Sequence, residues 1–140
     1  MPAPLPIDDG LAELLKAALK LEKFFPVFGT RELVMLFPHS GFYRFAAGEL
    51  VITQGEASRD IYILQSGCVS VMKGEKLLAT LVAPEIFGEI ALIRDGVRVA
   101  SAAASEESCI FRLSYPDIQA LMAGNPPLAE HLESLARERA

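Results

Sequence analysis

One segment of the sequence combines residue types that suit the binding of an anion. It begins with Gly88 and Glu89 and continues to Arg98. Glycine lets the backbone come close to a ligand because it has no β-carbon. A helical turn after it would present free N–H groups that attract a phosphate. The planar guanidinium of Arg98 suits two phosphate oxygens. The segment therefore predicts an anion cradle.

Glu89 needs a separate explanation, because a carboxylate beside a phosphate repels it. In a 3′,5′-cyclic nucleotide the ribose 2′-OH is free, and a carboxylate accepts its hydrogen bond well. Glu89 is therefore expected to bind a ribose hydroxyl. The alternative is that Glu89 and Arg98 pair with each other, and an exposed ion pair contributes only about 0–1 kcal/mol.

The elements that must position these residues change character at Gly41. Residues 41–113 contain short segments rich in Val, Ile, Tyr and Phe, separated by glycines. Apolar residues alternate with period two at Ile61 and Ile63 and at Val69 and Val71. Short strands at near-regular turn spacing are typical of an all-β sandwich, roll or barrel.

Helices are expected on both sides of this β unit. Residues 1–7 predict a flexible arm, and residues 8–38 predict N-terminal helices, the first of which has an apolar stripe. Residues 114–139 predict two closing helices, separated by Gly124 and the following prolines. The stripe is expected to pack on its own domain; the alternative is a contact face for a partner or a second copy.

The segment from Phe87 to Ser101 resembles the phosphate-binding cassette of cyclic nucleotide-binding domains, with F-G-E-[LI]-A-L followed by R-x-A-[ST]. Two upstream segments also resemble the family. Residues 48–56 match G-x-x-[IV]-x-x-x-G-[DE], and residues 62–67 match Y-x-[IL]-x-x-G. The resemblance covers about residues 24–139.

The resemblance implies a fold that is mainly β with flanking α, in one domain over residues 8–140. Its centre is an eight-stranded β-roll, which resembles a jelly roll and is also described as a double-stranded β-helix. It also implies that Glu89 binds the ribose 2′-OH and that Arg98 binds the cyclic phosphate. The other expected ligand-binding residues are Gly88, Ile90, Ala91, Val99, Ala100 and Ser101. Val97 departs from the family pattern, which often has proline before the arginine.

The expected ligand is cAMP, with cGMP weaker. Members of the family that select cGMP commonly have threonine directly after the cassette arginine, and this chain has Val99. The family also implies that the last helix acts as a lid coupled to ligand binding. Its expected lid residues are Leu132, Leu135, Arg137 and Arg139. Alternatively, the two arginines are solvated charges of the tail.

Composition excludes several function classes. The 140 residues are 51% hydrophobic and include 13 basic and 18 acidic residues, for a net charge of −5. This balance argues against a nucleic-acid surface. No apolar stretch approaches the roughly 18 residues of a membrane span, and no secretory signal is visible. We expect a cytoplasmic protein in which Cys68 and Cys109 are free thiols.

The expected protein is a signal-transduction module and not an enzyme. The only histidines, His39 and His131, lie far apart, so no metal site is predicted. Arg59 and Asp60 are expected at a solvated corner. One alternative is a degenerate copy of the domain that binds no nucleotide. Another is a transcription factor, which needs about 70 further residues for its DNA-binding helices. The N-terminal or C-terminal helices could also contact a second copy or an effector domain.

Overall fold

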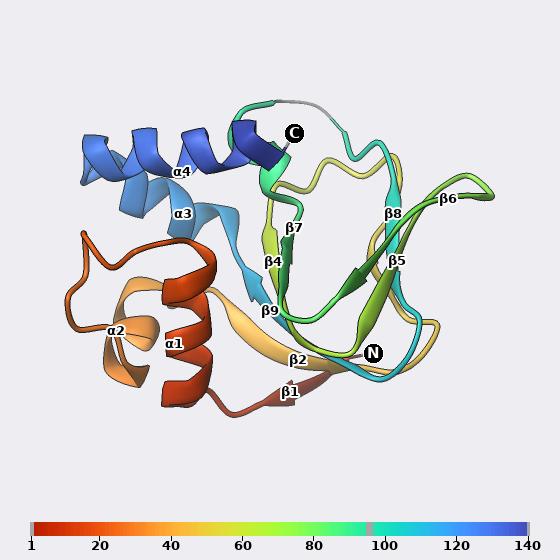
Figure 1. The fold of residues 1–140 in the computed structure, drawn as a ribbon, viewed down its shortest axis with the longest axis horizontal. Helices are drawn as coiled ribbons and strands as arrows, with labels where there is room; N and C mark the ends of the chain where they lie inside the picture. Colours follow the sequence, from red (N-terminus) through yellow and green to blue (C-terminus); the bar gives the residue numbers. More distant parts are fainter. Residues whose placement is uncertain (1, 95–96, 140) are drawn as a thin grey trace.

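The computed structural model describes residues 2–94 and 97–139, without the side chains of Ala91 and Arg139. The helices gather at one end of the molecule, and the strands form a roll at the other (Figure 1). The helices are α1 (Asp9–Ala18), α2 (Thr30–Leu36), α3 (Tyr115–Ala123) and α4 (Pro126–Arg139), and a short 3₁₀ turn, η1, spans Glu89–Leu92.

Two antiparallel sheets make up the roll. The first has the order β1-β2-β9-β4-β7 and the second the order β3-β8-β5-β6. The strands of the first sheet are β1 (Ala3–Leu5), β2 (Gly41–Phe45), β9 (Ser108–Leu113), β4 (Ile61–Ser66) and β7 (Glu85–Phe87). Those of the second are β3 (Leu50–Ile52), β8 (Ser101–Ala104), β5 (Cys68–Lys73) and β6 (Lys76–Val82).

The N-terminal arm differs from the expectation. Instead of a flexible segment, Ala3–Leu5 forms β1, with Pro4 opposite Tyr43 of β2. Prolines favour extended backbone, and they are tolerated at the edge of a sheet, where an N–H is not required. The arm therefore extends the sheet by one short edge strand.

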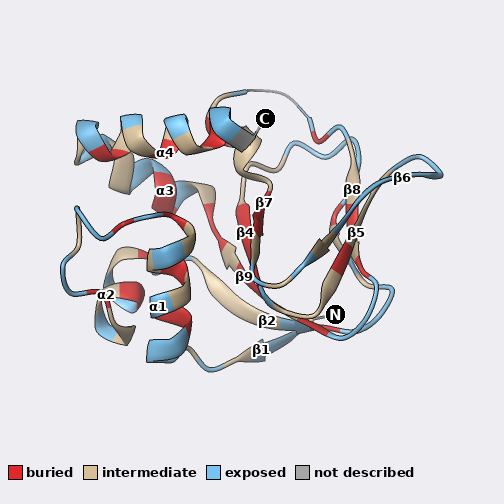
Figure 2. Cartoon of the chain, viewed as in Figure 1, coloured by how far each residue is buried: buried red, intermediate tan, exposed pale blue. Residues whose placement is uncertain are grey.

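Alternate residues of β4 divide the core into two parts. Ile61 and Ile63 pack with the helices in one cluster, whereas Tyr62 and Leu64 pack inside the roll in the other. The predicted period of two is thus present, and β4 is buried on both faces. Figure 2 shows this burial in the central strands and along the inner sides of the helices. The first sheet therefore separates the core under the helices from the core inside the roll.

The first helix packs on its own domain, as expected from its stripe. Leu11 and Leu15 are buried, and Leu14 is partly buried against the same cluster. Asp8 caps α1 by accepting a hydrogen bond from the N–H of Leu11 at 2.8 Å. This packing fixes α1 against the first sheet, next to the end where the cassette lies.

Candidate functional site

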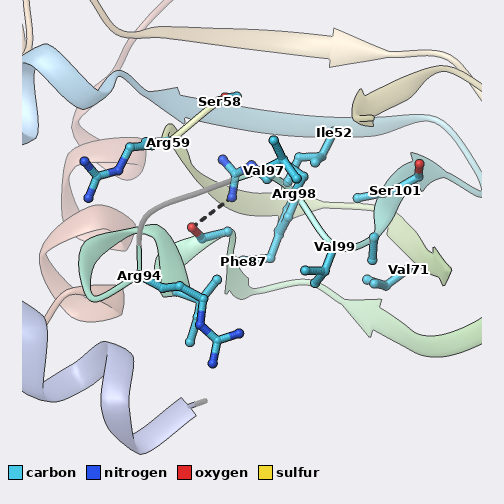
Figure 3. Close-up of a pocket in the computed structure, with 14 residues that line it drawn as sticks. Ile52, Ser58, Arg59, Val71, Phe87, Arg94, Val97, Arg98, Val99 and Ser101 are labelled. Carbon is cyan, nitrogen blue, oxygen red and sulfur yellow. Dashed lines mark hydrogen bonds between the residues drawn. The ribbon is translucent and has the colours of Figure 1, made fainter. Parts of the chain in front are cut away.

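A cavity of about 190 Å³ lies where the cassette returns to β8. Six of the eight predicted ligand-binding residues line it. They are Gly88, Ile90, Arg98, Val99, Ala100 and Ser101. The side chain of Ala91 lies outside the described residues, and Glu89 is not among the described lining residues. Figure 3 shows the lining, which mixes arginines with apolar side chains.

Gly88 occupies a position that requires glycine. Its φ is +82°, in the left-handed region, and it begins the predicted helical turn η1. A β-carbon there would lie 3.1 Å from the carbonyl oxygen of Asp60 and 3.2 Å from Nη1 of Arg98. The absence of a side chain therefore allows the guanidinium to reach the backbone of the cassette.

Arg98 is the buried cation of the cavity, with 8% of its surface exposed. Nη1 donates to the carbonyl of Gly88 at 3.2 Å, and Nη2 donates to the carbonyl of Asp60 (Figure 3 shows the first of these bonds). Its Nε is buried with no hydrogen-bond partner among the described residues. The partners of this charge are backbone carbonyls and not a carboxylate, so the site can accept an anion.

The electrostatics of Arg98 follow from this burial. Burial lowers the pKa of Arg98, and the nearby Tyr62, Glu56 and Asp60 act in the opposite direction. An arginine keeps its charge at neutral pH in spite of such a shift. Burial also raises the pKa of Tyr62, which stacks on Phe87 with 5.3 Å between the ring centroids. The cavity floor is thus a fixed positive charge beside neutral aromatic rings.

Asp60 has a structural role that the sequence analysis did not predict. Its Oδ2 accepts a hydrogen bond from Nη1 of Arg112 at 2.9 Å, and its Oδ1 accepts one from the N–H of Tyr115 at 2.8 Å. Its backbone carbonyl accepts the bond from Arg98. The expected solvated corner is therefore wrong for Asp60, which joins β4, β9, the start of α3 and the cassette.

The other half of that corner also belongs to the site. Arg59 lines the cavity, and its Cζ lies 4.2 Å from the centroid of the Tyr115 ring. Four further lining residues were not predicted to bind a ligand: Arg94, Ser58, Ile52 and Val71. Alternation with period two could have predicted that Ile52 and Val71 face inward. No local sequence pattern identifies Arg59 or Arg94 as cavity residues.

Glu89 lines a second cavity, of about 250 Å³, beneath α4. Leu132 and Leu135 of α4 line the same cavity, together with Lys20 at the end of α1. The structure therefore brings Glu89 toward α4 and not into the cavity that Arg98 lines.

The expected lid residues lie on α4, and no described residue of this helix lines the first cavity. Leu132 is buried and Leu135 is partly buried, so both pack inward as expected. Arg137 is exposed, and the side chain of Arg139 lies outside the described residues. In this structure α4 packs against η1 and α3. The helix thus contacts the turn at the start of the cassette without lining the first cavity in the described part of the chain.

The rim of the first cavity determines what a ligand base would meet. Val99 is 58% exposed and carries no hydroxyl. Oγ of Ser101 accepts a hydrogen bond from the N–H of Gln54 at 2.8 Å. One lone-pair direction of this hydroxyl is therefore already in use.

The described residues show neither a metal-binding cluster nor a membrane-spanning helix. No group of three or more His, Cys, Asp or Glu side chains there could hold a metal ion. None of the helices in the described part is long and apolar enough to span a bilayer.

Comparison with known proteins gives a family match. The family model described as the cyclic nucleotide-binding domain matches residues 42–125, more than half of the chain. The chain is 33% identical over 97 residues to the cyclic AMP receptor protein of Thermus thermophilus, covering 66% of this chain and 45% of that protein. It is 32% identical over 79 residues to the cAMP-dependent protein kinase regulatory subunit of Hypocrea atroviridis, and the match covers 56% of this chain and 17% of that protein.

Solved structures with the same fold confirm the predicted fold class. The sensor domain of the transcriptional regulator DNR from Pseudomonas aeruginosa superposes with a TM-score of 0.74 and 28% identity, covering 91% of this chain and 86% of that one. The Thermus thermophilus catabolite activator protein superposes with a TM-score of 0.68 and 26% sequence identity, covering 86% of this chain and 57% of that one. The chain spans less than half the length of the two curated relatives named above.

Proposed function

Because the chain belongs to the cyclic nucleotide-binding domain family, we propose that it is a cAMP-preferring sensor whose ligand binding is coupled to α4. In this proposal the cyclic phosphate binds Arg98, the ribose 2′-OH binds Glu89, and the purine lies against the apolar rim.

The observation that carries the proposal is the environment of Arg98. A buried cation with only carbonyl partners and a buried Nε without an acceptor is unfavourable unless an anion completes its shell. A phosphate in the cavity would accept charge-assisted hydrogen bonds from the guanidinium. The two carbonyl bonds orient the guanidinium before a ligand arrives, which lowers the entropic cost of binding.

The position of Glu89 supports the coupling to α4. Glu89 lines the second cavity together with Leu132 and Leu135. To reach a ribose in the first cavity, it has to leave that place, and η1 has to turn. Because α4 packs on η1, the turn changes the contacts of α4. A ligand shifts such an equilibrium only by its different affinity for the two states, and the bond to Glu89 supplies that difference.

The rim supports the preference for cAMP. A guanine amino group needs an acceptor, and Val99 offers none. Ser101 is the nearest substitute in the sequence, but its hydroxyl oxygen already accepts from Gln54. Adenine has no amino group at C2 of the purine ring, so it leaves no hydrogen-bond donor without an acceptor beside Val99. The preference over cGMP is expected to be modest, because Ser101 keeps one lone pair.

Titration calorimetry with cAMP and 5′-AMP tests the proposal. The two nucleotides share base and ribose, so they separate recognition of the cyclic phosphate from general purine binding. We expect cAMP to bind one to one in the micromolar range, about −8 kcal/mol, and 5′-AMP to bind more weakly. If cAMP does not bind, the chain is a degenerate copy of the domain and the proposal is wrong.

A further inference from the structure

The edges of the two sheets differ in length and in how they are protected. Within the described residues the outer strands are β1, β7, β3 and β6. The first three have three residues each, whereas β6 has seven. β1 has Pro4 at its centre, and in β7 the N–H of Ile86 donates to the side chain of Glu85 at 3.0 Å. Such features protect an edge against pairing with another chain, and β6 is neither short nor interrupted by proline.

The backbone of β6 is unpaired on its outer side in the described part of the chain. β6 pairs with β5 on one side only. In an antiparallel pair, every second residue directs its N–H and C=O away from the partner strand. Among the described residues, no hydrogen bond outside the ladder with β5 reaches a backbone group of residues 76–82. The N–H of Gly74 in the turn before β6 donates to Oε1 of Gln54 at 3.0 Å, so the hairpin is anchored while its outer edge is open.

The side chains of β6 also favour contact with another strand. Leu77, Leu78 and Val82 are 55%, 48% and 67% exposed, and Figure 2 shows most of the strand as exposed. Residues 77–82 include no charged residue and no proline. An uncharged segment of this kind on an open edge pairs readily with a second strand. β6 therefore offers both unpaired main-chain groups and apolar side chains to an extended partner.

The charge of β6 favours a second copy of the same strand in the antiparallel orientation. Lys76, the first residue, is the only charged residue of β6. In an antiparallel pair centred on Ala79, the two Lys76 side chains lie about 20 Å apart at about 3.3 Å per residue, beyond the screening length of about 10 Å. Each lysine then lies opposite Val82 of the second copy. Parallel pairing would instead place the two lysines side by side.

The position of β6 leaves room for a second copy. Figure 1 shows β6 at the end of the molecule away from the helices. A twofold axis through the centre of β6 therefore places the helices of the two copies far apart. No described residue that lines the first cavity belongs to β6, so this contact does not compete with a ligand there.

We propose that β6 is a dimerisation edge, at which β6 of one copy pairs antiparallel with β6 of a second copy. The two four-stranded sheets then form one sheet of eight strands, and a single twofold contact covers both open edges. Two strands of this length form an interface at the small end of specific protein contacts, so we expect a dissociation constant in the micromolar range. The inference is independent of the proposed function, because it uses no residue of the first cavity.

Sedimentation velocity of the full chain, over a concentration series through the micromolar range, tests the inference. Leu77→Lys adds a charge to β6. Its matched control is Leu50→Lys, at an equally exposed position (55% for each leucine) on β3, the other edge of the same sheet. Val82→Lys and Val82→Glu form a second pair, because they remove the same valine and differ in the sign of the added charge. Thermal unfolding of each variant verifies that it folds.

We expect the unmodified chain to form a dimer and no larger species. Leu77→Lys should raise the dissociation constant about tenfold or more, because two leucine contacts are lost per dimer, whereas Leu50→Lys should leave it unchanged. Val82→Lys should dissociate about tenfold more readily than Val82→Glu, because the new side chain lies opposite Lys76 of the second copy at two symmetric places. Amides of residues 77–82 should exchange more slowly as the concentration of the unmodified chain rises.

Four results would overturn the inference. The chain could stay monomeric throughout the series, which would mean that a second copy does not cover β6. Leu50→Lys could dissociate the dimer while Leu77→Lys does not, which would place the contact elsewhere. Equal dissociation constants for Val82→Lys and Val82→Glu would contradict the antiparallel pairing. Assembly beyond the dimer would contradict a closed twofold contact.

Discussion

At the scale of single residues, Arg98 is a buried charge whose guanidinium is oriented by two backbone carbonyls. The sequence predicted its role from the residue type and its distance from Gly88. It could not predict that the carbonyl of Asp60 would hold the guanidinium, because the two residues are far apart in the sequence and meet only after the sheets form. The same holds for the bonds of Asp60 to Arg112 and Tyr115.

The direction of the Glu89 side chain is a second feature that could not be predicted from the sequence. Residue type predicted a ribose contact, whereas its side chain lines the cavity under α4. In a turn of four residues, the direction of one side chain depends on what packs against the turn. Sequence periodicity does not contain that information, because η1 is too short to have an apolar face of its own.

The preference between cyclic nucleotides is testable at Val99. Val99→Thr places a hydroxyl beside the base without a large change of volume, so it should narrow the difference between cAMP and cGMP by strengthening cGMP. The gain should be about 0.5–1.5 kcal/mol, the net value of one hydrogen bond. Competition binding measures both affinities. Val99→Ala serves as the control, since it alters size without adding a donor or an acceptor. A clear preference of the unmodified chain for cGMP would contradict the account.

At the scale of elements, the order of helices and strands could be predicted from the sequence, and their contacts could not. Alternation at Ile61 and Ile63 predicted β4, and Gly124 with the prolines after it predicted the break between α3 and α4. The pairing of β1 with β2 was missed because Ala3–Leu5 has no apolar alternation. Its pairing depends on a free sheet edge, which only the folded chain provides.

The proposed coupling of α4 to the ligand gives a prediction for hydrogen exchange. Leu128 and Leu132 are buried and anchor the first turns of the helix. Addition of cAMP should change the contacts of the later turns, because they pack near η1. Amides of residues 128–138 should exchange more slowly with cAMP, whereas those of α2 should not change. Hydrogen exchange with mass spectrometry measures both regions. Equal exchange of α4 with and without ligand would rule out the lid.

The turn between β4 and β5 gives a prediction about stability. Gly67 has φ of +97°, and a β-carbon there would lie 2.6 Å from the carbonyl oxygen of Glu107. Gly55 has a similar φ of +92° with open space around it. Gly55→Ala should therefore cost about 1–2 kcal/mol of unfolding free energy through backbone strain alone.

Gly67→Ala should cost about 1–3 kcal/mol more than Gly55→Ala, because overpacking adds to the strain. Urea denaturation of both variants measures the difference. Equal losses would mean that the corner between the two sheets is looser than the structure indicates.

At the scale of the whole molecule, charge is distributed unevenly. The chain is acidic overall, yet the cavity has arginines at its floor and mouth. Composition alone predicted the sign of the total charge, but it could not locate the arginines of the cavity. These arginines come from two connections that the roll brings together: Arg59 precedes β4, whereas Arg94 and Arg98 lie between η1 and β8. Contacts with a second copy or an effector through the helices stay a prediction.

The central claim is that Arg98 binds the phosphate of a cyclic nucleotide, and calorimetry with cAMP on Arg98→Ala tests it most directly. The unmodified chain and Arg98→Lys are measured beside it, and thermal unfolding verifies that each protein is folded. We expect Arg98→Ala to weaken binding by about 1.5–3 kcal/mol, or about tenfold to a hundredfold. Arg98→Lys should restore little, because an ammonium group cannot form the planar pair of hydrogen bonds. Unchanged affinity of a folded Arg98→Ala protein would contradict the account.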